Sequence, residues 1–237
     1  MNKRHPSSFA AVIGVMCLFV SCASDEAIPS AERLSDALIT ADDIDGDWTL
    51  FAGPQGGDEQ IDPSGILTNE QRELVPSLEM CDEASDEAKR ATERLRPVVF
   101  RQLNLAVDDG IDPPFDRTGH LIFLQEFLYT GDRKEMEDTF SSIRQGLTDC
   151  LGDLPAGEEG PGRAEEMDVP EVGDESFGVL TTIEEAGGWA EWRIQSLIVR
   201  DGPVIVSLVL VDIRADVDPY FSTEDFDEIA RIAAAKL

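Results

Sequence analysis

The sequence predicts an α+β domain in which an antiparallel sheet is covered by helices. Segments 177–187, 189–200 and 203–213 are rich in the β-branched and aromatic residues typical of strands. Asp201-Gly202 separates the last two, and this dipeptide favours a tight hairpin turn. Residues 132–151 instead repeat apolar side chains at helical spacing. Apolar residues make up 42% of the chain, which is enough for a buried core.

Local signals place the other elements in order along the chain. Ser30 is the expected N-cap of a first helix over 30–40, and Thr40 and Asp43 have capping-box spacing for a single helical turn. Ser222 or Thr223 is expected to cap the last helix. The remaining pattern predicts helices over 68–75, 81–94 and 224–237, and strands over 98–107 and 119–130.

The start of the chain has the pattern of a lipoprotein signal peptide. Lys3 and Arg4 precede an apolar stretch over residues 9–21, which is shorter than the roughly 20 residues of a membrane-spanning helix. The sequence Phe-Val-Ser-Cys ending at Cys22 fits a lipobox, in which the cysteine thiol receives a diacylglycerol. The pattern predicts that Cys22 is the lipidated first residue of the mature protein. The alternative is a cleaved signal followed by a soluble secreted domain.

This interpretation sets the domain boundaries and the location of the protein. We expect residues 1–21 to be the signal peptide, residues 22–30 a tether, and residues 31–237 a single domain. Acyl chains such as palmitate on Cys22 would then hold the domain at the cell membrane, on its extracytoplasmic face.

Two cysteines, Cys81 and Cys150, remain for the mature domain. Because an exported chain meets oxidising conditions, we expect a Cys81–Cys150 disulfide rather than a metal site or a reactive thiol. Both cysteines lie in segments with a helical pattern, so this bond would tie two helices together. In the chain-entropy model a loop of this length contributes about 4 kcal/mol to stability.

Residues 152–176 consist mainly of Gly, Pro and acidic residues. We expect them to form a flexible acidic loop. It would serve either as a plain connection or as a lid or partner-binding segment, since long loops without structure are uncommon inside compact domains.

The strands over 119–130 and 203–213 are apolar on both faces. An antiparallel sheet with one wet face would alternate between apolar and polar residues, so both faces must be covered. Either helices pack on both sides, or one face lines an apolar cavity for a lipid-like ligand.

Charge excludes one class of partner. The chain carries 49 acidic and 19 basic residues, a formal net charge of −30. Nucleic acids and anionic lipid headgroups bind mainly through Lys and Arg. We therefore expect no nucleic-acid partner, and contact with the membrane only through the lipid on Cys22.

Motifs for catalysis or metal binding are absent from the sequence. It has no G-x-S-x-G, S-x-x-K or H-E-x-x-H motif and no phosphate loop, and His120 is the one histidine beyond the signal peptide. The stretch from Asp43 begins like a calcium loop, but Gly46 is misplaced and Pro54 replaces the final Glu. The sequence thus predicts a protein that is not an enzyme and has no metal site and no cofactor.

Several of these features in combination resemble the actinobacterial lipoproteins that share the PknH-like extracellular sensor domain. The resemblance rests on the lipobox, on residues 38–49 (LITADDIDGDWT), 172–177 (VGDESF) and 197–212 (LIVRDGPVIVSLVLVD), and on the terminal helix. It implies an α+β sensor-like fold with a cleft and an unidentified ligand. The family usually has two disulfides, whereas this chain keeps one mature cysteine pair.

Together these observations predict a non-enzymatic, membrane-anchored envelope lipoprotein that binds a ligand or a protein partner outside the cytoplasmic membrane. A carrier of apolar envelope lipids, with a cavity beside the sheet, is the main alternative. A hydrolase that uses carboxylates beneath residues 152–176 is a third. Candidates for a binding surface are Tyr129, Trp189, Trp192 and Arg193, with core packing of the tryptophans as the alternative.

Overall fold

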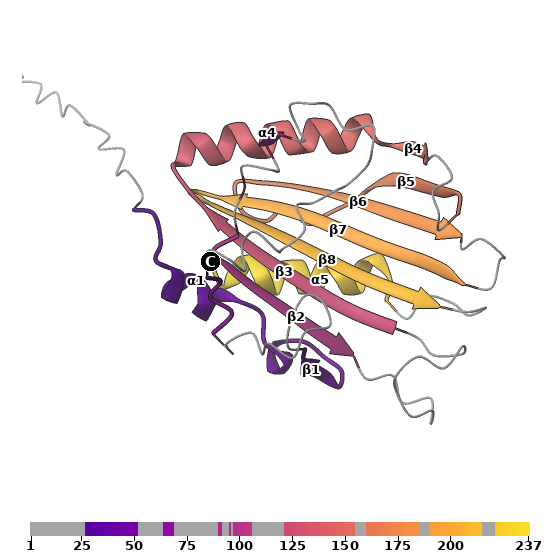
Figure 1. Cartoon of the computed structure of the whole chain (residues 1–237), viewed down its shortest axis with the longest axis horizontal. Coiled ribbons are helices and arrows are strands. Elements are labelled where there is room, and N and C mark those ends of the chain that lie inside the picture. The colour runs from indigo at the N-terminus through magenta and orange to yellow at the C-terminus, as the bar shows by residue number, and fades with distance from the viewer. Residues whose placement is uncertain are drawn as a thin grey trace, which may run out of the picture.

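The main feature of the fold is an antiparallel sheet of eight strands in the order β1-β2-β3-β8-β7-β6-β5-β4 (Figure 1). The strands are β1 (Trp48–Leu50), β2 (Val99–Leu105), β3 (Leu121–Thr130), β4 (Gly152–Leu154), β5 (Gly162–Met167), β6 (Glu175–Glu184), β7 (Glu191–Asp201) and β8 (Val204–Arg214). This computed structural model describes residues 27–51, 64–68, 90–91, 95, 97–105, 121–154, 160–184, 190–214 and 221–237. The predicted antiparallel α+β architecture is confirmed.

Helices cover both faces of the sheet. They are α1 (Ala31–Ala37), the single 3₁₀ turn η1 (Ala41–Asp43), α4 (Arg133–Asp149) and α5 (Thr223–Ala235). Figure 1 shows α4 along one side of the sheet, while α5 passes behind the strands. Leu34 of α1 and Phe226 of α5 belong to one buried cluster, and Phe140 of α4 belongs to a second.

Strand β8 explains why its sequence is apolar on both faces. Leu208 packs into the cluster beneath α1 and α5, and Ile205 packs into the cluster beneath α4. Because successive strand residues point to opposite faces, a strand between two helical layers is buried on both sides. Of the two interpretations of these apolar strands, coverage by helices is confirmed.

The predicted helix caps are present. The side chain of Ser30 accepts a hydrogen bond from the Arg33 amide at 3.3 Å. Thr40 and Asp43 form the predicted capping box around η1, and Ser222 forms another with Asp225 at the start of α5. These short polar side chains satisfy amide groups that have no partner inside the helix.

The predicted hairpin between β7 and β8 is also present, but its turn lies one residue later than expected. Asp201 still pairs with Val204, so the connection is Gly202-Pro203. Gly202 has a φ of 54°, a conformation that glycine adopts without strain.

Our prediction that residues 152–176 form one flexible loop is wrong, because β4 and β5 lie within it and form an edge of the sheet. In β5 only Ala164 and Met167 are buried, while Glu165 and Glu166 are exposed. The strand β5 lies next to the edge strand β4, and a strand with so few inward side chains does not produce an apolar run.

Several predicted features lie outside the described residues. These are the signal peptide, Cys22, Cys81 and the helix predicted over 68–75. Cys150 is the C-cap of α4 and is not a free thiol, but with Cys81 not described the Cys81–Cys150 bond stays a prediction. Within the described ranges, no helix is long and apolar enough to cross a membrane.

Candidate functional site

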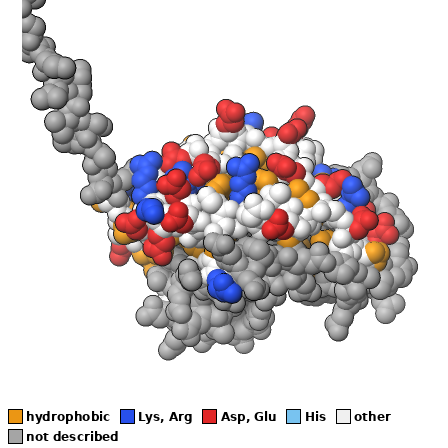
Figure 2. All heavy atoms as spheres, turned by 90° about the horizontal axis from the view of Figure 1, so that it is seen from above, with side chains coloured by type: hydrophobic (Ala, Val, Ile, Leu, Met, Phe, Trp, Pro, Cys, Tyr) orange, Lys and Arg blue, Asp and Glu red, His pale blue; other side chains and the backbone are white. Residues whose placement is uncertain are grey.

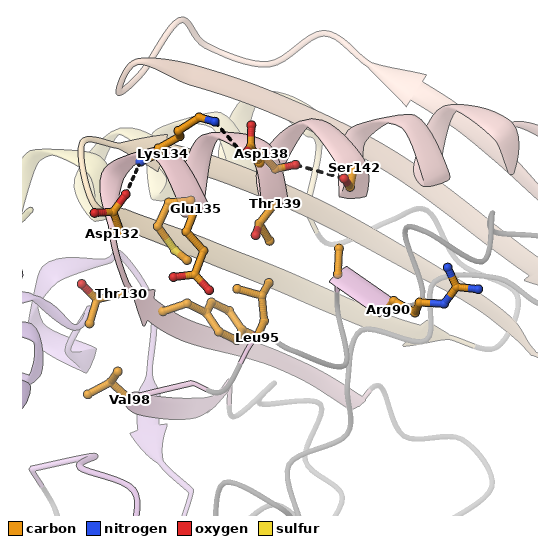
Figure 3. A pocket seen from close by; sticks show the side chains of 13 residues that line it. Arg90, Leu95, Val98, Thr130, Asp132, Lys134, Glu135, Asp138, Thr139 and Ser142 are labelled. Carbon is orange, nitrogen blue, oxygen red and sulfur yellow. Dashed lines mark hydrogen bonds and ion pairs between the residues drawn. The ribbon is translucent and has the colours of Figure 1, made fainter.

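A pocket of about 720 Å³ lies where the first half of α4 faces the end of β3 (Figure 3). Its described lining comes from three segments: residues 90–98, the end of β3, and α4 with its N-cap. The lining residues are Arg90, Ala91, Leu95, Val98, Tyr129, Thr130, Asp132, Lys134, Glu135, Met136, Asp138, Thr139 and Ser142. Pockets for small molecules have volumes of about 300–1,000 Å³, so this one has a suitable size.

A tight connection between β3 and α4 builds one wall of the pocket. The strand ends at Thr130, and Asp132 already caps the helix by accepting a hydrogen bond from the Lys134 amide at 3.0 Å. A Cβ atom at Gly131 would lie 2.7 Å from the Cε of Met136 and 3.2 Å from a carboxylate oxygen of Glu135. The turn therefore places these two side chains close to the strand end.

Aromatic side chains extend along the sheet to the pocket. Phe100 and Phe127 have ring centroids 4.6 Å apart, and Phe127 and Tyr129 have centroids 6.4 Å apart. Tyr129 is 4% exposed and lines the pocket, but its hydroxyl makes no hydrogen bond within the described structure. Burial raises the pKa of Tyr129, so at neutral pH its hydroxyl is protonated and can donate a hydrogen bond.

The charged side chains of the pocket differ in direction. In Figure 3, Glu135 points from α4 into the pocket towards Leu95, and Thr139 points to the same side of the helix. Lys134 turns away and pairs with Asp138, with 3.8 Å between its Nζ and a carboxylate oxygen. The guanidinium of Arg90 also points away from Glu135.

The start of α4 is held in place by Asp174, from the VGDESF stretch. One carboxylate oxygen of Asp174 accepts hydrogen bonds from Arg200 at 2.8 Å, from Arg133 at 3.2 Å and from the Gly202 amide at 3.2 Å. Burial opposes ionisation of Asp174, but the Gly202 amide and the Arg200 guanidinium outweigh it and lower the pKa. Asp174 thus joins the β7–β8 turn to the first turn of α4.

The backbone before Asp174 is constrained as well. Gly173 has a φ of 62°, and a Cβ atom there would lie 2.6 Å from the carbonyl oxygen of Arg200. The VGDESF stretch therefore has a structural role, which is to fix the elements that border the pocket.

A second group of charged residues lies on the opposite face, beneath α1. Glu126 is 2% exposed, and its Oε2 accepts a hydrogen bond of 2.6 Å from the Ile39 amide while its Oε1 has no partner. Arg101 donates to the carbonyl oxygens of Ile39 at 2.9 Å and Leu38 at 3.3 Å. Burial raises the pKa of Glu126 to about 7, although the Ile39 amide and Arg101 oppose this shift.

The candidate binding residues named from the sequence do not form one surface. Tyr129 pairs with Ile205, whereas Trp192 pairs with Ile213, eight residues further along β8. At about 3.3 Å per residue this separation is roughly 26 Å. Arg193 points to the face opposite Trp192, and Trp189 lies outside the described residues. Of the three that the structure describes, only Tyr129 lines the pocket.

Sequence analysis missed Glu135 and the wall formed by Arg90, Ala91, Leu95 and Val98. Glu135 looked like one of many acids on the polar face of an amphipathic helix, and only the packing of α4 on β3 sets it apart. Figure 2 shows how mixed this side of the molecule is, with acidic and basic side chains interspersed. Over the described part of the chain, no group of three or more His, Cys, Asp or Glu side chains is placed to hold a metal ion.

Comparisons with known proteins assign no family. No family model matches the chain, and neither does any curated protein. Among solved structures, it is similar to the extracellular domain of PknH from Mycobacterium tuberculosis, with 13% identity, a TM-score of 0.46, and coverage of 89% of this chain and 95% of that chain.

Two further solved structures are similar over a smaller part of the chain. LpqN, involved in cell envelope biogenesis of Mycobacterium tuberculosis, has 10% identity, a TM-score of 0.28, and coverage of 57% of this chain and 68% of its own. The human StarD13 lipid transfer and protein localization domain has 11% identity, a TM-score of 0.26, and coverage of 58% and 81%. The first of the three structures bears the name of the family that the sequence resembles, but at these identities and TM-scores none of the likenesses identifies a ligand or an activity.

Proposed function

We propose that this chain is a non-enzymatic lipoprotein of the cell envelope that binds a small-molecule ligand in the pocket between α4 and β3. One observation carries the proposal: the pocket combines a suitable volume with the side chain of Tyr129, whose hydroxyl has no hydrogen-bond partner among the described residues. Small-molecule pockets combine apolar walls with a few polar groups that orient the ligand. The Tyr129 hydroxyl is available to donate such a hydrogen bond to a ligand.

The described lining favours binding over catalysis. It includes one serine, Ser142, whose hydroxyl donates to the Asp138 carbonyl oxygen at 3.0 Å. A nucleophilic serine would instead need a base within hydrogen-bond reach. Since no described lining residue is a histidine or a cysteine, we propose a binding role.

Filling the pocket tests this proposal. The full-length protein, expressed with its signal and purified in mild detergent, is examined by native mass spectrometry for a bound molecule that organic solvent removes. In Thr139→Trp the indole would occupy the pocket, so we expect the bound molecule to be lost. Ser141→Trp is the matched control, because Ser141 is exposed on α4 and does not line the pocket. Equal occupancy in both variants would contradict the proposal.

We also propose that the lipid on Cys22 anchors the protein to the extracytoplasmic face of the membrane. The lipobox that ends at Cys22 supports this. Metabolic labelling with a palmitate analogue is expected to label the wild type and Cys17→Ser but not Cys22→Ser. Persistent labelling of Cys22→Ser would disprove the anchor.

The Cys81–Cys150 disulfide is a further part of this proposal. The capped, buried position of Cys150 at the end of α4 and its lack of a free thiol support it. Intact mass without reductant should be lower by two hydrogens than after reduction, and peptide mapping should recover the two cysteines linked. Recovery of Cys81 as a free thiol would refute the pairing.

A carrier of apolar envelope lipids remains the second candidate function. The volume of the pocket and its apolar residues Leu95, Val98 and Met136 favour it. The polar and charged side chains of α4 in the same lining favour a ligand with a polar group instead. The chemistry of the molecule released by solvent distinguishes the two functions, because a carrier would release a lipid.

A further inference from the structure

We infer that the ligand of the α4–β3 pocket is an organic cation, an alkylammonium compound whose positive group pairs with Glu135 and whose apolar part lies against Leu95, Met136 and the ring of Tyr129. This inference rests on the proposed ligand-binding function of the pocket. It adds the chemical class of the ligand.

The charges of the described lining leave one carboxylate without a partner. Asp132 caps α4 through the Lys134 amide, and Asp138 pairs with the Lys134 side chain. Arg90 also lines the pocket and has an interaction of its own, and its guanidinium points away from Glu135 (Figure 3). Glu135 makes no hydrogen bond and no ion pair with any described residue, although it points into the pocket. Within the described lining, Glu135 therefore carries a negative charge that no ion pair offsets.

The position of Glu135 in the first turn of α4 has a structural explanation, because acidic side chains there interact favourably with the helix dipole. That explanation does not account for its direction. In Figure 3, Lys134 turns away from the pocket, whereas Glu135 turns towards Leu95. Glu135 is exposed, but its carboxylate lies beside an apolar wall, so a bound alkylammonium group can pair with it while the alkyl chain contacts that wall.

The other walls suit the rest of an alkylammonium compound. Leu95, Val98 and Met136 offer apolar contact. The Tyr129 ring, supported by Phe127 behind it, is a surface on which a cation or its neighbouring methylene groups can lie. A net charge of −30 over the whole chain further favours the approach of cations and disfavours anions.

Matched probes that differ only in charge test the inference. The full-length protein in detergent is titrated with hexylammonium, hexanoate and hexanol, and binding is followed by NMR shifts of the Thr130–Ser142 amides. We expect hexylammonium to bind most tightly and to weaken as salt is raised. In Glu135→Gln we expect its affinity to fall about fivefold or more. Glu137→Gln, an exposed change on α4 outside the pocket, should leave the affinity unchanged.

The outcomes separate this inference from the proposed function. Four results would each overturn the inference that the ligand is a cation. They are equal binding of hexylammonium and hexanol, tighter binding of hexanoate, an unchanged affinity in Glu135→Gln, and no binding of any probe. If Thr139→Trp nevertheless releases a neutral or anionic molecule that the wild type holds, ligand binding stands and only the cation inference fails. If the wild type holds no molecule at all, both fail.

Discussion

At the scale of single residues, Glu126 is the clearest departure from its sequence pattern. In an otherwise apolar strand it looked like an interruption. In the fold, the Glu126 carboxylate accepts a hydrogen bond from the Ile39 amide, just after α1. Arg101 donates hydrogen bonds to the carbonyl oxygens of Leu38 and Ile39. Strand periodicity indicates which face Glu126 occupies, but no local rule states that the N-terminal segment will lie over it. This contact depends on residues far apart in the chain.

The pKa of Glu126 gives stability a pH dependence of defined sign. Burial raises this pKa from 4.5 to about 7, so the folded state favours the neutral acid. The stabilisation is fully present below about pH 4.5 and is lost as pH rises to about 7, with a total of about 3 kcal/mol. Urea unfolding between pH 4.5 and 7.5 should show this decline, and Glu126→Gln should flatten it.

The other charged groups near Glu126 do not reverse this prediction. Arg101 keeps its charge across this range, and hydrogen bonds from Lys236 and Thr40 outweigh burial to lower the pKa of Asp43 to about 2. The contribution of Asp43 is therefore lost only as pH falls from about 4 towards 2. A Glu126→Gln variant that retains the wild-type decline between pH 4.5 and 7 would show that another group causes it.

At the scale of elements, the sequence predicts those parts of the fold that repeat a strong pattern. Helix α4 follows the 3.6-residue period with Phe140 and Ile143 inward, and α5 begins at a capping box. Strands β4 and β5 were missed because strands at or beside the edge of a sheet can bury few side chains and be rich in charge, as Glu165 and Glu166 of β5 show. The pocket could not be predicted, since it depends on how α4 lies relative to Arg90, Ala91, Leu95 and Val98.

The Asp174 contacts are predicted to stabilise the joint between α4, β6 and the β7–β8 turn. Arg200 is 8% exposed and shares hydrogen bonds with Asp174 and Glu175. Removing one partner leaves a buried charge poorly compensated, so Asp174→Ala should lower the free energy of unfolding by about 2–3 kcal/mol. Chemical denaturation of the full-length protein measures this change.

Asp153→Ala is the matched control for Asp174→Ala. This substitution removes the ion pair between Asp153 and Arg163, in which the Asp153 side chain is 89% exposed. Such an exposed pair contributes little to stability, so we expect a much smaller loss than in Asp174→Ala. If both variants lose the same stability, the Asp174 contacts do not have the role assigned to them.

At the scale of the whole molecule, the sheet separates two buried clusters, one on each face. The cluster beneath α1 and α5 holds the chain's N-terminal segment, and Lys236 near the C-terminus pairs with Asp43 of η1 at 2.5 Å. The cluster beneath α4 supports the pocket. Because Glu126 and Glu135 share no described partner and belong to opposite faces of the sheet, their effects should be independent.

Independence of the two faces gives a prediction for a double-variant cycle. Glu126→Gln should change the pH dependence of stability and leave hexylammonium affinity unchanged, while Glu135→Gln should do the reverse. In the double variant the two changes in unfolding free energy should add within about 0.5 kcal/mol. A larger coupling would mean that α4 and α1 communicate through the sheet. Protonation of Glu126 beneath α1 would then alter the pocket, and ligand binding would depend on pH through Glu126.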